Sequence, residues 1–99
     1  MGVFFDLPVV TKKERKAATK FRQFLLDQGF EMSQYSVYLR FCAGKEQAEV
    51  YTKRIGEKVP SSGKVHILCF TDKQYERMVC FDGRKRERGK RNPAQFTLF

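Results

Sequence analysis

Strand-like and helix-like patterns alternate along this chain of 99 residues, and the alternation restricts the folds open to it. Apolar residues recur at helical spacing in two segments, and at alternate positions or in short runs between them. The predicted order is strand, helix, strand pair, helix and strand, followed by a short helical turn and a last strand. The approximate ranges are 3–7, 11–28, 30–42, 45–58, 65–70, 71–77 and 78–81.

Interleaved strands and helices predict an α+β fold, in which two helices pack on one face of an open sheet. The order corresponds to the ferredoxin-like βαββαβ arrangement with an extra C-terminal strand. Whether the stretch 30–42 forms two strands or one strand broken near Ser33 stays open. The strand at 65–70 is apolar on both faces, which is typical of a central strand. Because the sheet face away from the helices lacks a cover, we expect a homodimer that pairs through the sheets.

The first helix has clear start and stop signals and carries basic side chains on both flanks. Thr11 and Glu14 have capping-box spacing, and Gly29 suits the C′ position. The apolar arc that should face the sheet consists of Ala17, Ala18, Phe21, Phe24 and Leu25. The residues that we predict to contact nucleic-acid phosphates are Lys12, Lys13, Arg15, Lys16, Lys20, Arg22, Arg40 and Arg77.

The net charge of +9 favours a polyanionic partner such as nucleic acid or an acidic membrane surface. No apolar run approaches the roughly 20 residues that span a bilayer, and no signal peptide is visible, so we expect a cytoplasmic protein that does not insert into membranes. No phosphate-binding loop, dinucleotide fingerprint or zinc cluster is present. Because no set of side chains for reading base edges is visible either, nucleic-acid binding should be indifferent to sequence.

Asp6 is the leading candidate for a functional residue. It ends the apolar run Val3-Phe4-Phe5, just before Pro8 terminates the strand. A carboxylate held on a strand can bind a cation, and two copies of Asp6 brought together by a two-fold axis could hold Mg²⁺ with water and phosphate oxygens. The alternative is that Asp6 caps the turn at 8–11 or the helix after it.

The remaining polar residues with possible site chemistry give weaker signals. Cys42, Cys69 and Cys80 lack metal-ligand spacing and lie in apolar contexts, so we expect buried free thiols. His66 is the only histidine, and we interpret it as a packing or surface residue because a single histidine cannot form a zinc site.

The chain divides into a predicted domain over 1–83 and a basic tail over 84–99. The tail carries six basic residues and one acid and ends in the alternating apolar stretch 96–99. That stretch is too short to fold alone and should pack on another surface. The tail residues that we expect to bind a partner are Arg84, Lys85, Arg86, Arg88, Phe96, Leu98 and Phe99.

Four motifs occur together in an order and spacing that resemble a known family. They are Val3-Phe4-Phe5-Asp6-Leu7-Pro8, Glu14-Arg15-Lys16, Gln34-Tyr35-Ser36-Val37-Tyr38 and Thr71-Asp72-Lys73-Gln74-Tyr75-Glu76-Arg77. The chain is similar to the small CRISPR-associated adaptation proteins of the CRISPR-associated endoribonuclease family. These proteins are partners of the spacer integrase, and the motifs resemble those of type II systems. The resemblance covers about residues 3–82.

The resemblance implies a ferredoxin-like homodimer that acts in spacer acquisition with the CRISPR integrase. It also implies that Asp6 lies near the two-fold axis as the catalytic residue and the Mg²⁺ ligand of an endonuclease that acts on single-stranded RNA or on a DNA duplex. Two alternatives stay open. One is a purely non-catalytic scaffold that holds a DNA duplex between integrase subunits, and the other is a toxin-like ribonuclease of the same fold.

Overall fold

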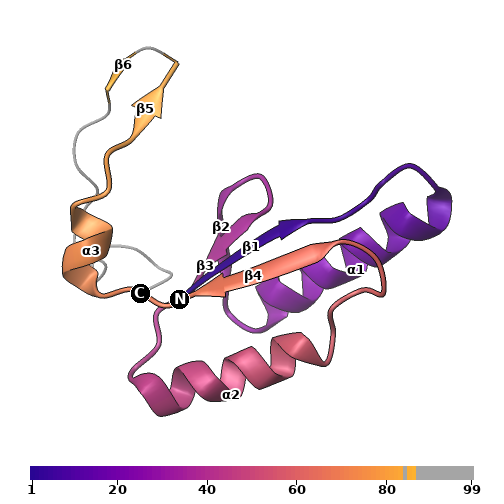
Figure 1. The fold of residues 1–99 in the computed structure, drawn as a ribbon, viewed down its shortest axis with the longest axis horizontal. Coiled ribbons are helices and arrows are strands. Elements are labelled where there is room, and N and C mark those ends of the chain that lie inside the picture. Colours follow the sequence, from indigo (N-terminus) through magenta and orange to yellow (C-terminus); the bar gives the residue numbers. More distant parts are fainter. Residues whose placement is uncertain (84, 87–99) are drawn as a thin grey trace.

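The computed structural model describes residues 1–83, 85 and 86. It contains a mixture of strands and helices in the predicted order (Figure 1). The elements are β1 (Gly2–Asp6), α1 (Lys12–Asp27), β2 (Glu31–Gln34), β3 (Val37–Leu39), α2 (Lys45–Gly56), β4 (Lys64–Leu68), α3 (Asp72–Glu76), β5 (Phe81–Asp82) and β6 (Lys85–Arg86).

Strands β1 to β4 form one antiparallel sheet in the order β2-β3-β1-β4. β1 lies in the interior of the sheet and pairs with both β3 and β4. α1 and α2 lie on the same side of the sheet, whereas α3 and the β5–β6 hairpin extend from one end of it (Figure 1). This arrangement confirms the predicted ferredoxin-like fold and places β1, the strand that carries Asp6, in the interior of the sheet.

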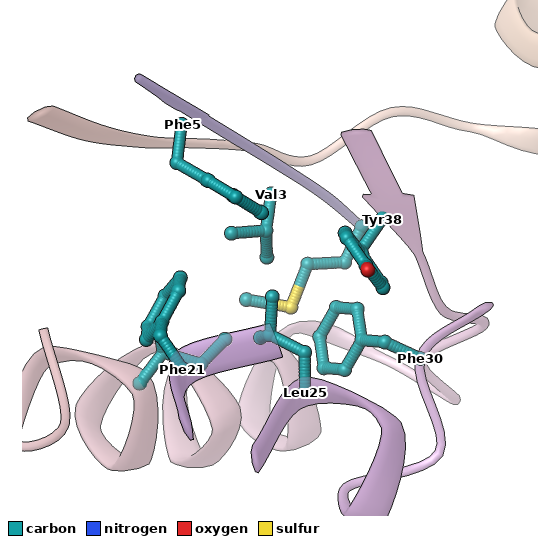
Figure 2. Close-up of a cluster of buried hydrophobic side chains, with 8 residues drawn as sticks. Val3, Phe5, Phe21, Leu25, Phe30 and Tyr38 are labelled. Carbon is teal, nitrogen blue, oxygen red and sulfur yellow. The ribbon is translucent and has the colours of Figure 1, made fainter. Parts of the chain in front are cut away.

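The hydrophobic core fills the space between the sheet and the two long helices. Phe5 packs edge-on against Phe21 of α1 at 5.3 Å between ring centroids and stacks on Tyr38 of β3 at 5.6 Å. Figure 2 shows Val3, Phe5 and Tyr38 projecting from the sheet toward Phe21 and Leu25. The buried members of this cluster are Met1, Val3, Phe5, Phe21, Leu25, Phe30, Tyr38 and Ile55.

Local capping signals set the ends of α1 and α3. Thr11 Oγ1 accepts a hydrogen bond from the amide of Glu14, and the Glu14 carboxylate accepts one from the amide of Thr11. The same reciprocal pair joins Thr71 and Gln74 at the start of α3. Beyond the end of α1, Gly29 adopts a φ of 87°, which favours glycine. Both capping boxes therefore form as sequence spacing predicts.

The stretch 30–42 forms a hairpin, with its turn at Tyr35 and Ser36 rather than a break near Ser33. Ser36 adopts a φ of 64°, and the β2–β3 register shifts between Met32 and Gln34. The extra residue in β2 produces a bulge, which alternation of apolar residues alone does not reveal.

Two further strand predictions are wrong. β4 is an edge strand of the four-stranded sheet, with alternating half-buried and exposed residues, instead of a central strand covered on both faces. The last strand, predicted at 78–81, is instead β5, which is limited to Phe81 and Asp82 and pairs with β6. This hairpin crosses the predicted boundary between 83 and 84, and the separate status of the tail stays a prediction.

The cysteines are free, as expected, but none of the three is fully buried. Cys42 and Cys80 are half-buried and Cys69 is exposed. Cys69 directly follows the edge strand β4, and the chain leaves the sheet at this point. The expectation of buried thiols is therefore wrong.

Candidate active site and nucleic-acid interface

Asp6 lies at the C-terminal end of β1 and is exposed on the sheet face opposite the long helices. Side chains alternate between the two faces of a strand, and Val3 and Phe5 point into the core (Figure 2). Phe4 and Asp6 therefore project from the other face, which we call the open face. The strand fixes the backbone that carries the carboxylate while the carboxylate itself stays accessible to solvent.

The Asp6 carboxylate has no partner among the residues that the structure describes. It makes no hydrogen bond and no ion pair there. Thr11 and Glu14 cap α1, and the Arg15 guanidinium donates to the carbonyl oxygens of Val9 and Val10 in the preceding turn. The structure thus does not support the alternative in which Asp6 caps the turn or the helix.

Antiparallel pairing brings two basic side chains of β4 to the same face as Asp6. Lys64 is the cross-strand partner of Asp6, and His66 is the partner of Phe4. Directly opposed residues share a face of the sheet. These residues, together with Phe5, line a shallow cavity of about 350 Å³. A carboxylate, an ammonium group, an imidazole and an aromatic side chain therefore belong to residues that line one small cavity.

Sequence reasoning missed this neighbourhood because Asp6 and His66 are sixty positions apart. The alternation in β4 was the available signal: Val65 and Ile67 pack against the core, whereas Lys64 and His66 are exposed. That pattern places Lys64 and His66 on one face but does not give their register against β1.

One carboxylate per chain fits Mg²⁺ only as part of a larger ligand set. Within the described ranges, no group of three or more acidic, histidine or cysteine side chains could hold a metal ion. Mg²⁺ in proteins is commonly bound through one or two carboxylates, with water and substrate phosphates filling the other positions. The unpaired oxygens of Asp6 match this chemistry and leave room for a second copy of the chain to contribute.

The predicted phosphate-binding residues fall into two groups. Several have exposed side chains that make no hydrogen bond or ion pair within 1–83, 85 and 86. These are Lys12, Lys13, Lys16, Lys20 and Arg77. In the second group, guanidinium donors already have partners in the chain. Arg15 binds Val9 and Val10, and Arg22 donates to Thr19 Oγ1 at 3.2 Å.

Arg40 has the largest structural role of the predicted basic residues. Its Nε donates to the carbonyl oxygen of Gln28 at 2.8 Å and its Nη1 to that of Phe41 at 2.6 Å. The guanidinium carbon also lies 4.2 Å from the centroid of the Tyr51 ring. Arg40 therefore links the end of α1 to α2, and its contact with nucleic acid stays a prediction.

Most of the predicted partner-binding tail lies outside the described residues. This applies to Arg84, Arg88, Phe96, Leu98 and Phe99. The backbone of Lys85 and Arg86 forms β6 and pairs with β5. The role of the tail in binding a partner stays a prediction.

The fold and site define a class: a small ferredoxin-like α+β protein with an exposed acid at the end of its first strand and a basic helix surface. The model of the family described as CRISPR associated protein Cas2 matches residues 1–78. The chain belongs to this family, which confirms the family resemblance seen in the sequence.

Similarity to individual relatives extends over nearly the whole chain. The chain is 57% identical over 99 residues to the CRISPR-associated endoribonuclease Cas2 of Paracidovorax avenae, covering 100% of this chain and 92% of the relative. Proteins of the same name from Flavobacterium psychrophilum and Parvibaculum lavamentivorans are each 50% identical, over 98% and 96% of this chain and 84% and 94% of theirs.

In the part of the chain that the structure describes, no helix has the length and apolar character needed to cross a bilayer.

Proposed function

We propose that this chain is the dimeric, sequence-independent nucleic-acid-binding subunit of a CRISPR spacer integration complex, in which it partners the CRISPR integrase. The observation that carries the proposal is a row of exposed lysines along α1, at Lys12, Lys13, Lys16 and Lys20, whose side chains have no partner among the described residues. Each lysine that neutralises a phosphate releases counterions, so such a row binds a duplex through its backbone without reading bases.

The open face of the sheet supports the dimer. Phe4 is 36% exposed, Leu68 56% and Met78 39%. Together with Phe70 and Tyr75, these side chains line an apolar hollow of about 480 Å³. A second copy that pairs through this face would remove these apolar groups from water.

Duplex binding measured against salt concentration tests the binding role. We expect affinity for a short DNA duplex of arbitrary sequence to fall steeply from low to physiological salt. Co-purification with the integrase and the same duplex tests the assembly role. An affinity that is flat with salt, or strong preference for one sequence, would contradict the proposal.

Asp6 favours a second activity, the Mg²⁺-dependent endonuclease cleavage of single-stranded RNA or duplex DNA. The carboxylate is exposed on a rigid strand and has no partner among the described residues, so it is available for a ligand. The similar proteins from three organisms are named endoribonucleases. Bound Mg²⁺ supplies charge neutralisation at the phosphate and acidifies coordinated water.

In this activity Asp6 binds and orients the metal, while the ammonium group of Lys64 lies beside the site and attracts the phosphodiester. Asp6→Asn keeps the shape of the side chain but removes its charge. We expect this variant to lose Mg²⁺-dependent cleavage and to keep duplex binding. Cleavage by purified Asp6→Asn at the wild-type rate would contradict the hydrolytic role and leave the binding role standing.

A further inference from the structure

A cavity of about 160 Å³ lies on the helix side of the sheet, and we call it the docking cavity. Its walls come from the turn after β1, the first turns of α1 and the loop before β4, which meet at one end of the fold (Figure 1). Most of the lining is apolar and consists of Leu7, Pro8, Ala17, Ala18 and Pro60. Because Leu7 also packs against the core under the helices, a second copy on the open face leaves this cavity accessible.

Contacts within the chain hold the walls of the docking cavity in place. A Cβ at Gly63 would lie 2.8 Å from Cδ2 of Leu7 and 3.0 Å from Cδ of Pro8, so the loop before β4 packs closely on the turn after β1. The guanidinium of Arg15 donates to the carbonyl oxygens of residues 9 and 10 in that turn. The cavity is therefore preformed, and a ligand that enters it has little chain to order.

Exposed apolar side chains flank the cavity on two of its segments. Val10 is 84% exposed and Val9 46%, directly after Pro8, and Val59 is 37% exposed, directly before Pro60. Scattered apolar residues are common on surfaces, whereas a group of them beside an apolar hollow is typical of an interaction site. A cavity of about 150 Å³ holds a benzene ring, so the docking cavity has room for one aromatic or large aliphatic side chain.

The charged groups beside the cavity are mainly basic. Lys12 and Lys13 extend from α1 and Lys58 precedes the loop; all three are exposed, and their side chains have no partner among the described residues. Of the neighbouring acids, Glu14 already accepts a hydrogen bond in the capping box, and Glu57 lies next to Lys58. The net charge of +9 acts in the same direction. An occupant with acidic residues around an apolar anchor complements this surface.

Charge and polarity argue against three other occupants. The tail over 84–99 carries six basic residues and one acid, so the basic rim repels it. A second copy carries the same charge of +9 and has the apolar open face available to it. A nucleic-acid backbone would bind the lysines, but it would neither fill the apolar cavity nor cover the valines. An acidic protein segment with an apolar side chain satisfies both parts of the surface.

We propose that the docking cavity and its flanking valines bind an acidic segment of a partner protein, which inserts one aromatic or large aliphatic side chain. The proposal rests on the assembly role proposed above, in which the partner is the CRISPR integrase. It adds the surface that the integrase contacts: the end of the helix layer, beside the α1 lysines that we assign to the duplex. The integrase and the duplex can then bind side by side.

Two neutral substitutions test the cavity without changing the charge. Val10→Ser removes an exposed apolar contact, and Ala17→Leu fills the cavity from α1 with a residue that favours helices. Each should weaken integrase binding at least about 10-fold, a loss expected of a central apolar anchor. Biolayer interferometry of the purified proteins, with and without a short duplex, measures this. The control is Val50→Ser, the same change at a 48% exposed position on α2, which should bind as wild type does.

Opposite charges at one position test whether the bound segment is acidic. Val10→Asp should repel such a segment and Val10→Lys should attract it, so the aspartate variant should bind the integrase more weakly. The difference should shrink as salt is raised, because salt screens exposed charges. Equal affinities of the two variants, or weaker binding by Val10→Lys, would overturn the acidic partner.

The outcomes separate this proposal from the assembly role on which it rests. If wild type binds the integrase and Val10→Ser and Ala17→Leu bind equally well, the docking cavity is refuted and the assembly role stands. If both variants lose duplex affinity and keep integrase affinity, the cavity belongs to the nucleic-acid interface and the proposal fails. If wild type binds no integrase in either condition, both fail. Thermal denaturation checks folding, and if Ala17→Leu is destabilised, the exposed Val10 variants decide.

Discussion

The backbone of Gly63 packs directly against the end of β1 that carries Asp6. Gly63 adopts a φ of 98°, and a Cβ at this position would lie 2.7 Å from the carbonyl oxygen of Asp6. Gly63 also immediately precedes Lys64, the cross-strand partner of Asp6. The missing side chain lets the start of β4 close on β1 at the point where the candidate site begins.

Gly63→Ala should therefore damage both stability and the site. Alanine is strained at positive φ, and its Cβ would push the Asp6 backbone away, so we expect the free energy of unfolding to fall by about 2 kcal/mol or more. Gly56→Ala is the matched control, because a Cβ there meets no atom within 4 Å and alanine favours helices. Urea denaturation of both variants makes the comparison, and equal stabilities would contradict the proposed close packing.

Asp6→Asn should separate activity from stability. Asp6 is exposed and its carboxylate has no partner in the described chain, so the substitution should change the free energy of unfolding by less than about 0.5 kcal/mol. Nuclease activity should nevertheless be lost. Denaturation and cleavage assays on the same preparation test this, and destabilisation above about 1 kcal/mol would show that Asp6 has a structural role instead.

Phe4 and Phe5 are neighbouring phenylalanines on opposite faces of β1, and their alanine variants should fail in different ways. Phe5 is buried between Phe21 and Tyr38, so Phe5→Ala should cost about 3–5 kcal/mol of folding free energy. Phe4 is partly exposed on the open face, so Phe4→Ala should mainly weaken the dimer. Sedimentation equilibrium and denaturation measured in parallel test this, and an unchanged dissociation constant for Phe4→Ala would argue against dimerisation through that face.

Features set by neighbouring residues were predictable from the sequence. Thr11 with Glu14 and Thr71 with Gln74 define helix starts because the capping groups are three residues apart. The apolar arc of α1 follows from the helical period, and Phe21 is indeed buried. The exposed position of Asp6 at the end of β1 also follows from the local pattern, whereas its role as a site residue stays a prediction.

Features that depend on long-range pairing were not predictable. The position of His66 opposite Phe4 follows from the β1–β4 register, which no local pattern encodes. β4 is apolar enough to resemble a central strand, yet it lies at an edge because β1 takes the interior position. The guanidinium of Arg40 likewise reaches the end of α1 only because the hairpin brings the two together.

Arg40 should contribute more to stability than the other basic residues. α1 has no basic residue in its last turn, and Arg40 donates to the carbonyl of Gln28 at that end while it covers the Tyr51 ring. We expect Arg40→Ala to lower the free energy of unfolding by about 1.5–3 kcal/mol, the range for hydrogen bonds to a charged group. The control is Arg54→Ala. Its guanidinium makes one longer hydrogen bond, of 3.3 Å, to Gln28 and lies farther from the Tyr51 ring centroid, at 5.3 Å, so its loss should cost under about 1 kcal/mol. A similar loss of stability in the two variants would contradict the structural role of Arg40.

Duplex binding and cleavage should depend on different parts of the molecule. The exposed lysines belong to α1, which lies in the helix layer (Figure 1), whereas the alternation along β1 places Asp6 on the open face of the sheet. A double variant with Lys16→Gln and Lys20→Gln should therefore weaken duplex binding and reduce the slope of log affinity against log salt by about 2, since each phosphate contact contributes about 0.9. The same variant should cleave a short single-stranded RNA at close to the wild-type rate.

The control for this variant is Lys53→Gln with Lys58→Gln, which removes the same charge from exposed positions at the end of α2 and just beyond it. If duplex binding falls equally in both double variants, binding follows net charge alone and α1 is not the interface. If it falls only in the α1 variant while cleavage persists, the duplex lies along α1. The binding surface and the Asp6 site are then physically separate, as the two layers of the fold imply.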